Sequence, residues 1–163
     1  KALAARVVQN ALSHSLTQKK LQATAWTTIG RMHRDAQQMP QAIEAAIKGR
    51  ASDPQAQGPL VLGLSLLPTG SAEIRSMLDE AMQGPATPDL RLGFARSLIA
   101  MQSTRDGLAQ LHRLTQEHPD FAPGWLLLGM LQVDLSQPAL ARQSLSRHVA
   151  LVKDSTDPSS KPA

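Results

Sequence analysis

The 163-residue sequence contains no cysteine and no tyrosine, and only 2% of its residues are aromatic. The lack of cysteine excludes disulfides, thiolate zinc sites and a cysteine nucleophile. Because aromatic residues are so scarce, a core must be built from the aliphatic residues, methionine and alanine that dominate the 42% hydrophobic content. Small aliphatic side chains let helices approach closely, so the composition favours packed helical hairpins over a β-sandwich.

Charge is also sparse. The net charge is +4, from 17 basic and 13 acidic residues. The high sequence pI of about 10.0 arises because, without Cys and Tyr, few groups titrate between histidine and lysine. The longest basic run is the pair Lys19-Lys20, whereas a nucleic-acid footprint needs a basic cluster or stripe. No apolar run approaches the roughly 20 residues that span a bilayer. We therefore predict no nucleic-acid partner and no transmembrane segment.

The arrangements that metal binding and catalysis require are missing too. Of the five histidines, none lies in an H-E-x-x-H pattern, and no two are three or four residues apart. There is no G-x-S-x-G elbow for a nucleophilic serine. The glycine pair Gly58 and Gly63 lacks the Lys-Ser/Thr that completes a phosphate-binding loop. We expect no catalytic residues, no metal and no cofactor, and predict that the protein is not an enzyme.

What is present is a repeated phrase. Tryptophan, two residues, an aliphatic residue and glycine occur at 26–30 and again at 125–129. Pro54, Pro85 and Pro119 are spaced 85 − 54 = 31 and 119 − 85 = 34 residues apart. With units beginning near 23, 57, 88 and 122, each tryptophan stands fourth in its unit and the prolines fall at or near unit ends. This pattern resembles the tetratricopeptide repeat (TPR) family, and the resemblance covers residues 21 to 153.

The resemblance implies an all-α fold, a right-handed superhelical solenoid of antiparallel helix pairs. About four repeats are expected, near 23–56, 57–87, 88–121 and 122–153. Apolar periodicity predicts the individual helices at 21–36, 40–50, 57–68, 71–83, 88–101, 104–117, 121–134 and 137–152. Ser71, Thr87 and Asp120 are predicted N-caps. Residues 1–20 are expected to form an N-terminal helix, either the second helix of an upstream repeat or a cap. Residues 154–163 are expected to be a disordered tail.

Departures from the family pattern are also visible. His33 and Gln132 stand where the family usually has tyrosine, and Arg91 stands at the tryptophan position of the third unit. The chain begins with Lys1 rather than Met, so we expect a fragment or a processed chain. The arginine-rich, Ala/Gln/Leu-rich style resembles bacterial repeat proteins of the proteobacterial envelope, which favours periplasm or cell envelope over cytoplasm.

In TPR proteins, certain positions of each first helix line a concave groove that holds a partner. The resemblance carries this role to Thr24, Thr27, Arg31, Asp35, Val61, Ser65, Asp89, Leu92, Arg96, Ile99, Leu126, Met130 and Val133. Apolar walls favour an extended segment or an amphipathic helix with aliphatic anchors. Arg31 and Arg96 are placed to bind a partner carboxylate, unless they are simply solvated surface residues.

The sequence therefore predicts a non-catalytic protein–protein interaction scaffold that binds a peptide or helix in its concave groove. An alternative is a structural segment of a larger TPR protein, which docks or forms a homo-oligomer through its terminal helices. A third possibility is RNA binding by helical repeats, which would show steep salt dependence. The partner's identity does not follow from the sequence.

Overall fold

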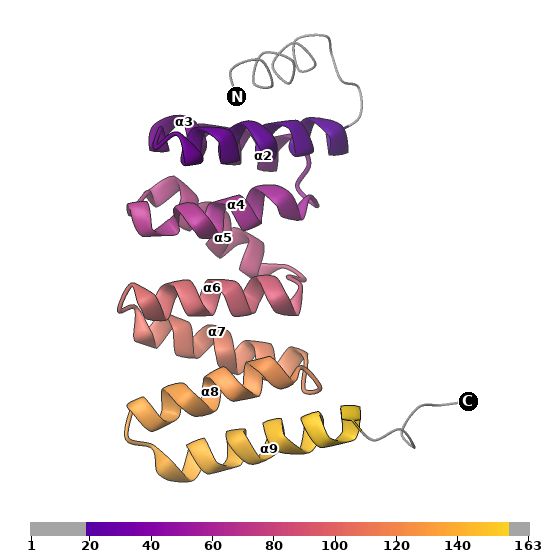
Figure 1. The fold of residues 1–163 in the computed structure, drawn as a ribbon, viewed down its shortest axis with the longest axis vertical. Coiled ribbons are helices and arrows are strands. Elements are labelled where there is room, and N and C mark those ends of the chain that lie inside the picture. Colours follow the sequence, from indigo (N-terminus) through magenta and orange to yellow (C-terminus); the bar gives the residue numbers. More distant parts are fainter. Residues whose placement is uncertain (1–18, 157–163) are drawn as a thin grey trace, which may run out of the picture. The chain divides into compact units, whose positions relative to one another are not determined.

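The computed structural model describes residues 19–156, and regular structure within them is entirely helical (Figure 1). The chain divides into two compact units between Ala86 and Thr87. This division falls between the second and third predicted repeats, so each unit holds two helix pairs. The all-α helical-repeat architecture predicted from the sequence is confirmed.

Unit 1 consists of α2 (Lys19–Asp35), α3 (Met39–Ser52), α4 (Gln57–Leu66), the 3₁₀ turn η1 (Leu67–Thr69) and α5 (Ala72–Gln83). Helix α2 packs on α3, and α4 packs on both of them and on α5. The close approach of α2 to α3 and α4 depends on Gly30. A Cβ there would lie 2.3 Å from a Leu62 methyl group and 3.2 Å from the Ala45 Cβ.

Unit 2 consists of α6 (Pro88–Ala100), α7 (Thr104–Glu117), α8 (Ala122–Asp134) and α9 (Pro138–Thr156). Helix α8 packs against α6, α7 and α9. The centre of this unit is a cluster of buried aliphatic residues from α6, α7 and α8, formed by Leu92, Ala95, Leu111, Leu114, Leu128 and Leu131. Because the chain has few aromatic residues, the core of this unit consists mainly of leucine.

The turns between paired helices share one backbone device. Gln37, Gln102 and Ser136 each have a positive φ, of 60°, 62° and 57°. In each turn the amide of the left-handed residue bonds to a carbonyl three positions back, and the next amide bonds five positions back. This is the pattern of a left-handed helix C-cap. In the second pair the left-handed residue is Gly70, with φ of 77°, at the end of η1. A left-handed residue whose amide bonds three positions back thus occurs in the turn of all four described helix pairs.

The eight helices predicted between residues 21 and 152 are present, with differences at their ends. The Ser71 and Thr87 hydroxyls accept hydrogen bonds from the Ile74 and Leu90 amides and act as N-caps, as predicted. The prediction for Asp120 is wrong. A turn in which the Phe121 amide bonds to the His118 carbonyl delays the helix, so Phe121 takes the N-cap position without a side-chain bond.

The ends of the chain differ from expectation where they are described. Helix α2 begins at Lys19, inside the segment assigned to the N-terminal helix, and α9 continues to Thr156, beyond the expected end of the solenoid. The rest of the predicted N-terminal helix and tail, residues 1–18 and 157–163, lies outside the described residues.

Candidate partner-binding surfaces

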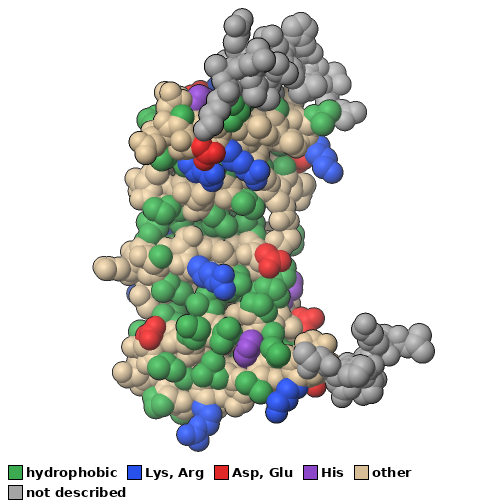
Figure 2. Space-filling view, viewed as in Figure 1, with side chains coloured by type: hydrophobic (Ala, Val, Ile, Leu, Met, Phe, Trp, Pro, Cys, Tyr) green, Lys and Arg blue, Asp and Glu red, His purple; other side chains and the backbone are tan. Residues whose placement is uncertain are grey.

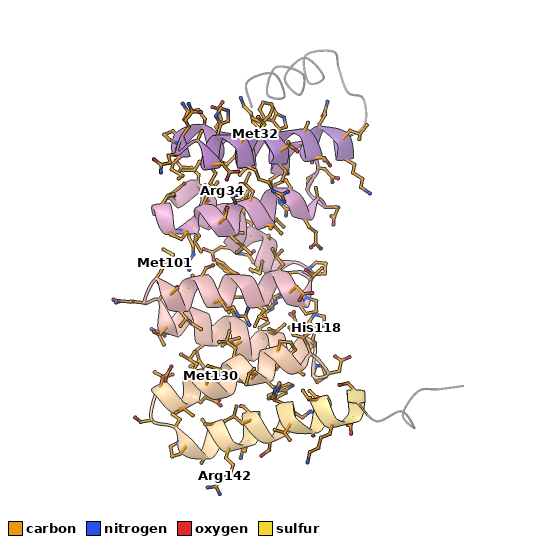
Figure 3. All side chains as sticks on the ribbon, viewed as in Figure 1. Met32, Arg34, Met101, His118, Met130 and Arg142 are labelled. Carbon is orange, nitrogen blue, oxygen red and sulfur yellow. The ribbon has the colours of Figure 1, made fainter. Side chains whose placement is uncertain are left out.

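Three exposed apolar side chains among the predicted groove residues lie on α8. Leu126, Met130 and Val133 expose 37%, 54% and 56% of their surface. Their spacing of four and three residues places them on one face of the helix, and we call them the α8 stripe. Met130 is labelled in Figure 3, and hydrophobic side chains gather over α8 and α9 on the face seen in Figure 2. Such a line of exposed aliphatic residues is typical of an interaction surface.

Helix α6 lies beside α8 and carries the corresponding predicted residues. Arg96 and Asp89 are exposed, whereas Ile99 is partly buried and packs against the core cluster of the unit. Leu92 is only 6% exposed and belongs to that cluster, so its assignment to a groove wall is wrong. On this side of unit 2 the available surface is the α8 stripe with a basic side chain and a half-buried isoleucine on α6.

In unit 1, the predicted residues Thr24 and Arg31 line a cavity of about 170 Å³ between α2 and α4. Both side chains are exposed. Thr27 lines the same cavity but is only 5% exposed, because its hydroxyl donates to the Ala23 carbonyl at 2.7 Å inside the helix packing. Thr27 therefore offers little of the contact surface that the sequence predicted.

The electrostatics of this cavity favour an anion. It is bounded by the start of α4, whose N-cap, Ala56, makes no side-chain hydrogen bond. The N-terminus of a helix carries partial positive charge. The Arg31 guanidinium adds a full positive charge on the neighbouring helix.

Further along the same two helices, Arg34, labelled in Figure 3, interacts with the predicted residues Asp35 and Ser65. Its guanidinium forms an ion pair with Asp35 at 3.0 Å and donates to the Ser65 hydroxyl oxygen at 3.1 Å. Val61, also on α4, is 48% exposed. The carboxylate of Asp35 is therefore engaged within unit 1, while Val61 remains an open apolar contact point.

A buried ion pair that the sequence did not predict lies between α6 and α7. Arg91 is fully buried, and its guanidinium contacts Glu117 at 3.1 Å and Gln110 at 3.0 Å. A hydrogen bond from Arg113 and the charges of the two arginines hold the pKa of the Glu117 carboxyl below its ordinary value. Burial lowers the pKa of Arg91. The only sequence signal was the presence of Arg91 at the tryptophan position.

Two properties of the described residues bear on other kinds of site. Between residues 19 and 156, no three histidine or acidic side chains are grouped as metal ligands. In the same range, no helix combines the length and apolarity needed to cross a membrane.

Comparison with solved structures places the fold. A crystal structure of MamA matches with a TM-score of 0.68 over 93% of this chain and 88% of that one, at 12% sequence identity. A second MamA structure matches with a TM-score of 0.61 over 82% and 74% of the two chains, at 15% identity. YrrB, described as a TPR protein with an unusual peptide-binding site, matches with a TM-score of 0.45 over 90% and 93%, at 12% identity.

The chain is thus an all-α, TPR-like helical-repeat protein, in agreement with the repeated tryptophan phrase of its sequence. The particular proteins that it is similar to in structure include MamA. At these identities the similarity concerns the fold. No protein-family model and no curated protein sequence matches the chain.

Proposed function

We propose that this protein is a non-catalytic protein-interaction scaffold that binds a partner peptide or helix along the first helices of its repeats. The observation that carries the proposal is the α8 stripe of Leu126, Met130 and Val133, which is exposed by 37–56%. Helix α6, which contacts α8, carries the exposed Arg96. A leucine core is already complete beneath it, so these side chains are not needed to hold the unit together.

The chemistry of the surface describes the partner segment. Full burial of an aliphatic side chain contributes about 1.5–3 kcal/mol, so three half-exposed residues offer roughly 3 kcal/mol. Micromolar affinity corresponds to about 8 kcal/mol. The apolar anchors therefore need support from polar contacts, and Arg96, exposed on α6 of the same unit, is the side chain that we expect to supply them.

We infer that Arg31 and Arg96 bind acidic groups of the partner. Charge-assisted, bidentate contacts are the interactions in which arginine excels. The uncapped start of α4 beside Arg31 further favours a carboxylate there. The expected ligand is an extended or helical segment with two or three aliphatic anchors and at least one Asp or Glu.

The test is a selection of binding peptides from a random library with the wild-type chain, followed by calorimetric titration of the best binders. Met130→Asp should lower their affinity at least roughly tenfold, because a charge at the centre of an apolar contact is costly to desolvate. Arg31→Glu/Arg96→Glu should weaken those peptides that carry Asp or Glu. Gln116→Asp, an exposed change on the second helix α7, is the matched control and should bind as wild type does.

Two outcomes would contradict the proposal. Peptides that bind Met130→Asp and wild type equally would place the binding surface elsewhere. A complete failure to select peptides would favour the alternative of a structural segment that docks through its terminal helices. Circular dichroism of each variant should show unchanged helix content, since all the substituted side chains are exposed.

A further inference from the structure

A second surface lies at the end of unit 2, on the side of α9. It is an open hollow of about 660 Å³. Its floor is apolar and its edges carry positive charge, and we call it the C-terminal hollow, defined by Val133, Ala141, Arg142, Leu145, Val149 and Lys153. Val149 is 48% exposed. Apart from Val133, which borders both surfaces, these residues are separate from the α8 stripe.

The sequence repeat indicates which kind of structural element fits this hollow. Leu145 stands 145 − 111 = 34 residues after Leu111, one repeat length along the chain. By the same offset, Val133 and Val149 correspond to Ile99 and Thr115. In the preceding helix pair Leu111 is 0% and Thr115 5% exposed, and Leu111 and Ile99 pack in the cluster with α8 residues. The positions at which α6 and α7 contact α8 thus recur on α8 and α9 at the end of unit 2. No described helix covers them there.

The C-terminal hollow differs in charge from the equivalent surface of the preceding helix pair. Arg142 occupies the position equivalent to Leu108, and Lys153 that of Pro119. No acidic residue lines the hollow, although Asp134 and Asp154 lie on the same two helices. The Arg142 side chain projects away from α9 (Figure 3), and no ion pair involves it in the part of the chain that the structure describes. An occupant with acidic groups would therefore meet complementary charge.

His148 limits the extent of the apolar contact surface in the hollow. His148 stands where Leu114 contacts Gly124 in the preceding pair. The His148 ring nitrogen Nδ1 is hydrogen-bonded at 3.0 Å to the Ala122 carbonyl of α8. This contact lies inside the last pair, so the apolar seat is concentrated around Leu145 and Val149.

Charge also argues against helix α2 of a second copy as the occupant. The first described helix, α2, would be the natural continuation of a stack, because it carries the same tryptophan phrase as α8. Its charged residues are Lys19, Lys20, Arg31 and Arg34 against a single acid, Asp35. Placing this basic helix on a hollow edged by Arg142 and Lys153 would bring like charges together, which is unfavourable.

We propose that the C-terminal hollow docks an amphipathic helix of a partner protein, in the way that α8 docks on α6 and α7, and that this helix carries Asp or Glu beside its apolar stripe. The apolar residues of the hollow pack against the apolar stripe of the partner helix, and Arg142 selects the acidic partner. Apart from Val133, this docking uses residues other than those of the α8 stripe.

The probes are three synthetic helical peptides. The first keeps the α8 residues that face the core, Gly124, Leu128 and Leu131, at their spacing, and has glutamate at the three positions of the α8 stripe. The second has lysine at those positions, and the third has serine in place of the core-facing leucines. Calorimetric titration against the full chain should show binding of the glutamate probe, roughly tenfold weaker binding of the lysine probe, and no binding of the serine probe.

Variants of the chain locate the contact. Val149→Asp should abolish binding of both apolar probes, and Arg142→Glu should reverse the preference so that the lysine probe binds more tightly. Gln143→Asp, an exposed change on α9 outside the lining of the hollow, should leave binding unchanged. Met130→Asp should also leave it unchanged, which separates this result from the test of the α8 stripe.

Several outcomes would overturn the proposal. Equal affinity for the glutamate and lysine probes would remove the charge selection. Binding that survives Val149→Asp, or no binding of either apolar probe, would remove the seat itself. Self-association of the wild-type chain in analytical ultracentrifugation, lost in Val149→Asp, would show that a second copy occupies the hollow instead.

Discussion

We predict that removing either partner of the ion pair between Arg91 and Glu117 lowers the free energy of unfolding by a different amount. Arg91 is fully buried, whereas the Glu117 side chain is 36% exposed and also accepts a 2.6 Å bond from Arg113. Removing the acid takes from a buried cation the Glu117 carboxylate that it contacts at 3.1 Å. Removing the cation leaves an acid that is still paired and solvated. The two single substitutions should therefore have different costs.

The magnitudes follow from the contacts. A charge-assisted hydrogen bond contributes about 1.5–3 kcal/mol, and the exposure of Glu117 places its bond to Arg91 near the lower end. The exposed pair with Arg113 adds only about 0.3–0.5 kcal/mol. Glu117→Gln should thus cost about 2 kcal/mol. Arg91→Met, which fills the same space with an apolar chain and loses the bond to Gln110, should cost less than about 1 kcal/mol.

The assay is urea unfolding followed by far-ultraviolet circular dichroism, with wild type, both single variants and Arg91→Met/Glu117→Gln. The double variant should be no less stable than Glu117→Gln alone, because methionine removes the buried charge. The reasoning would be refuted if Arg91→Met cost as much as Glu117→Gln, or if Glu117→Gln had no effect.

The same pair predicts a pH dependence. The pKa of Glu117 is lowered in the folded chain from its ordinary value of 4.5. The unfolded chain therefore binds this proton more readily than the folded chain, and stability from the pair is fully present above about pH 4.5. It is lost as the pH falls through the lowered folded pKa. The difference in stability between wild type and Glu117→Gln should be constant near neutrality and shrink below pH 4.5, and a pH-independent difference would contradict this.

Three further substitutions test the packing. Gly129→Ala should lower the free energy of unfolding by roughly 1–2 kcal/mol in urea titrations. The added Cβ would lie 2.7 Å from Leu145 side-chain atoms, and this overpacking outweighs the gain of about 1 kcal/mol in helix propensity. A net gain in stability would contradict this reasoning. Trp125→Ala should lower stability by about 2–4 kcal/mol in thermal unfolding. The cost is below that of a fully buried tryptophan because the ring is partly exposed, although its indole N–H donates to the Pro119 carbonyl. Unchanged unfolding would refute the packing role of Trp125. Gln102→Gly should stabilise by about 0.5–1 kcal/mol by relieving its left-handed conformation, whereas Gln116→Gly within α7 should destabilise.

Much of the fold was predictable because helical periodicity is a local signal. The predicted stripe of α6 consists of Leu90, Phe94, Leu98 and Met101. The first three are buried, as the period of an amphipathic helix requires, whereas Met101, at the C-cap of α6, is 37% exposed. The turn residue Gly70 was visible as well. The left-handed Gln102 and Ser136 were not, because their conformation is imposed by the bonding of the whole turn rather than by their own preference.

The candidate site was less predictable because exposure depends on the neighbouring helix. Thr27 is covered where Gly58 of α4 approaches it; a Cβ on Gly58 would lie 2.9 Å from the Thr27 hydroxyl oxygen. Leu92 fills the core between α6 and α7. Arg91 shows the opposite error, since a charged residue is expected outside until its partners Glu117 and Gln110 are known. The roles of the exposed residues remain predictions.

The aromatic-poor composition has a practical consequence for following this protein. Its two tryptophans fall one in each unit, Trp26 on α2 and Trp125 on α8, and no tyrosine emits beside them. Trp26→Phe leaves an intrinsic fluorophore in unit 2 alone, and Trp125→Phe leaves one in unit 1 alone. The emission of each variant therefore reports the unfolding of a single unit, and comparing the two curves shows whether the halves of the array lose structure together.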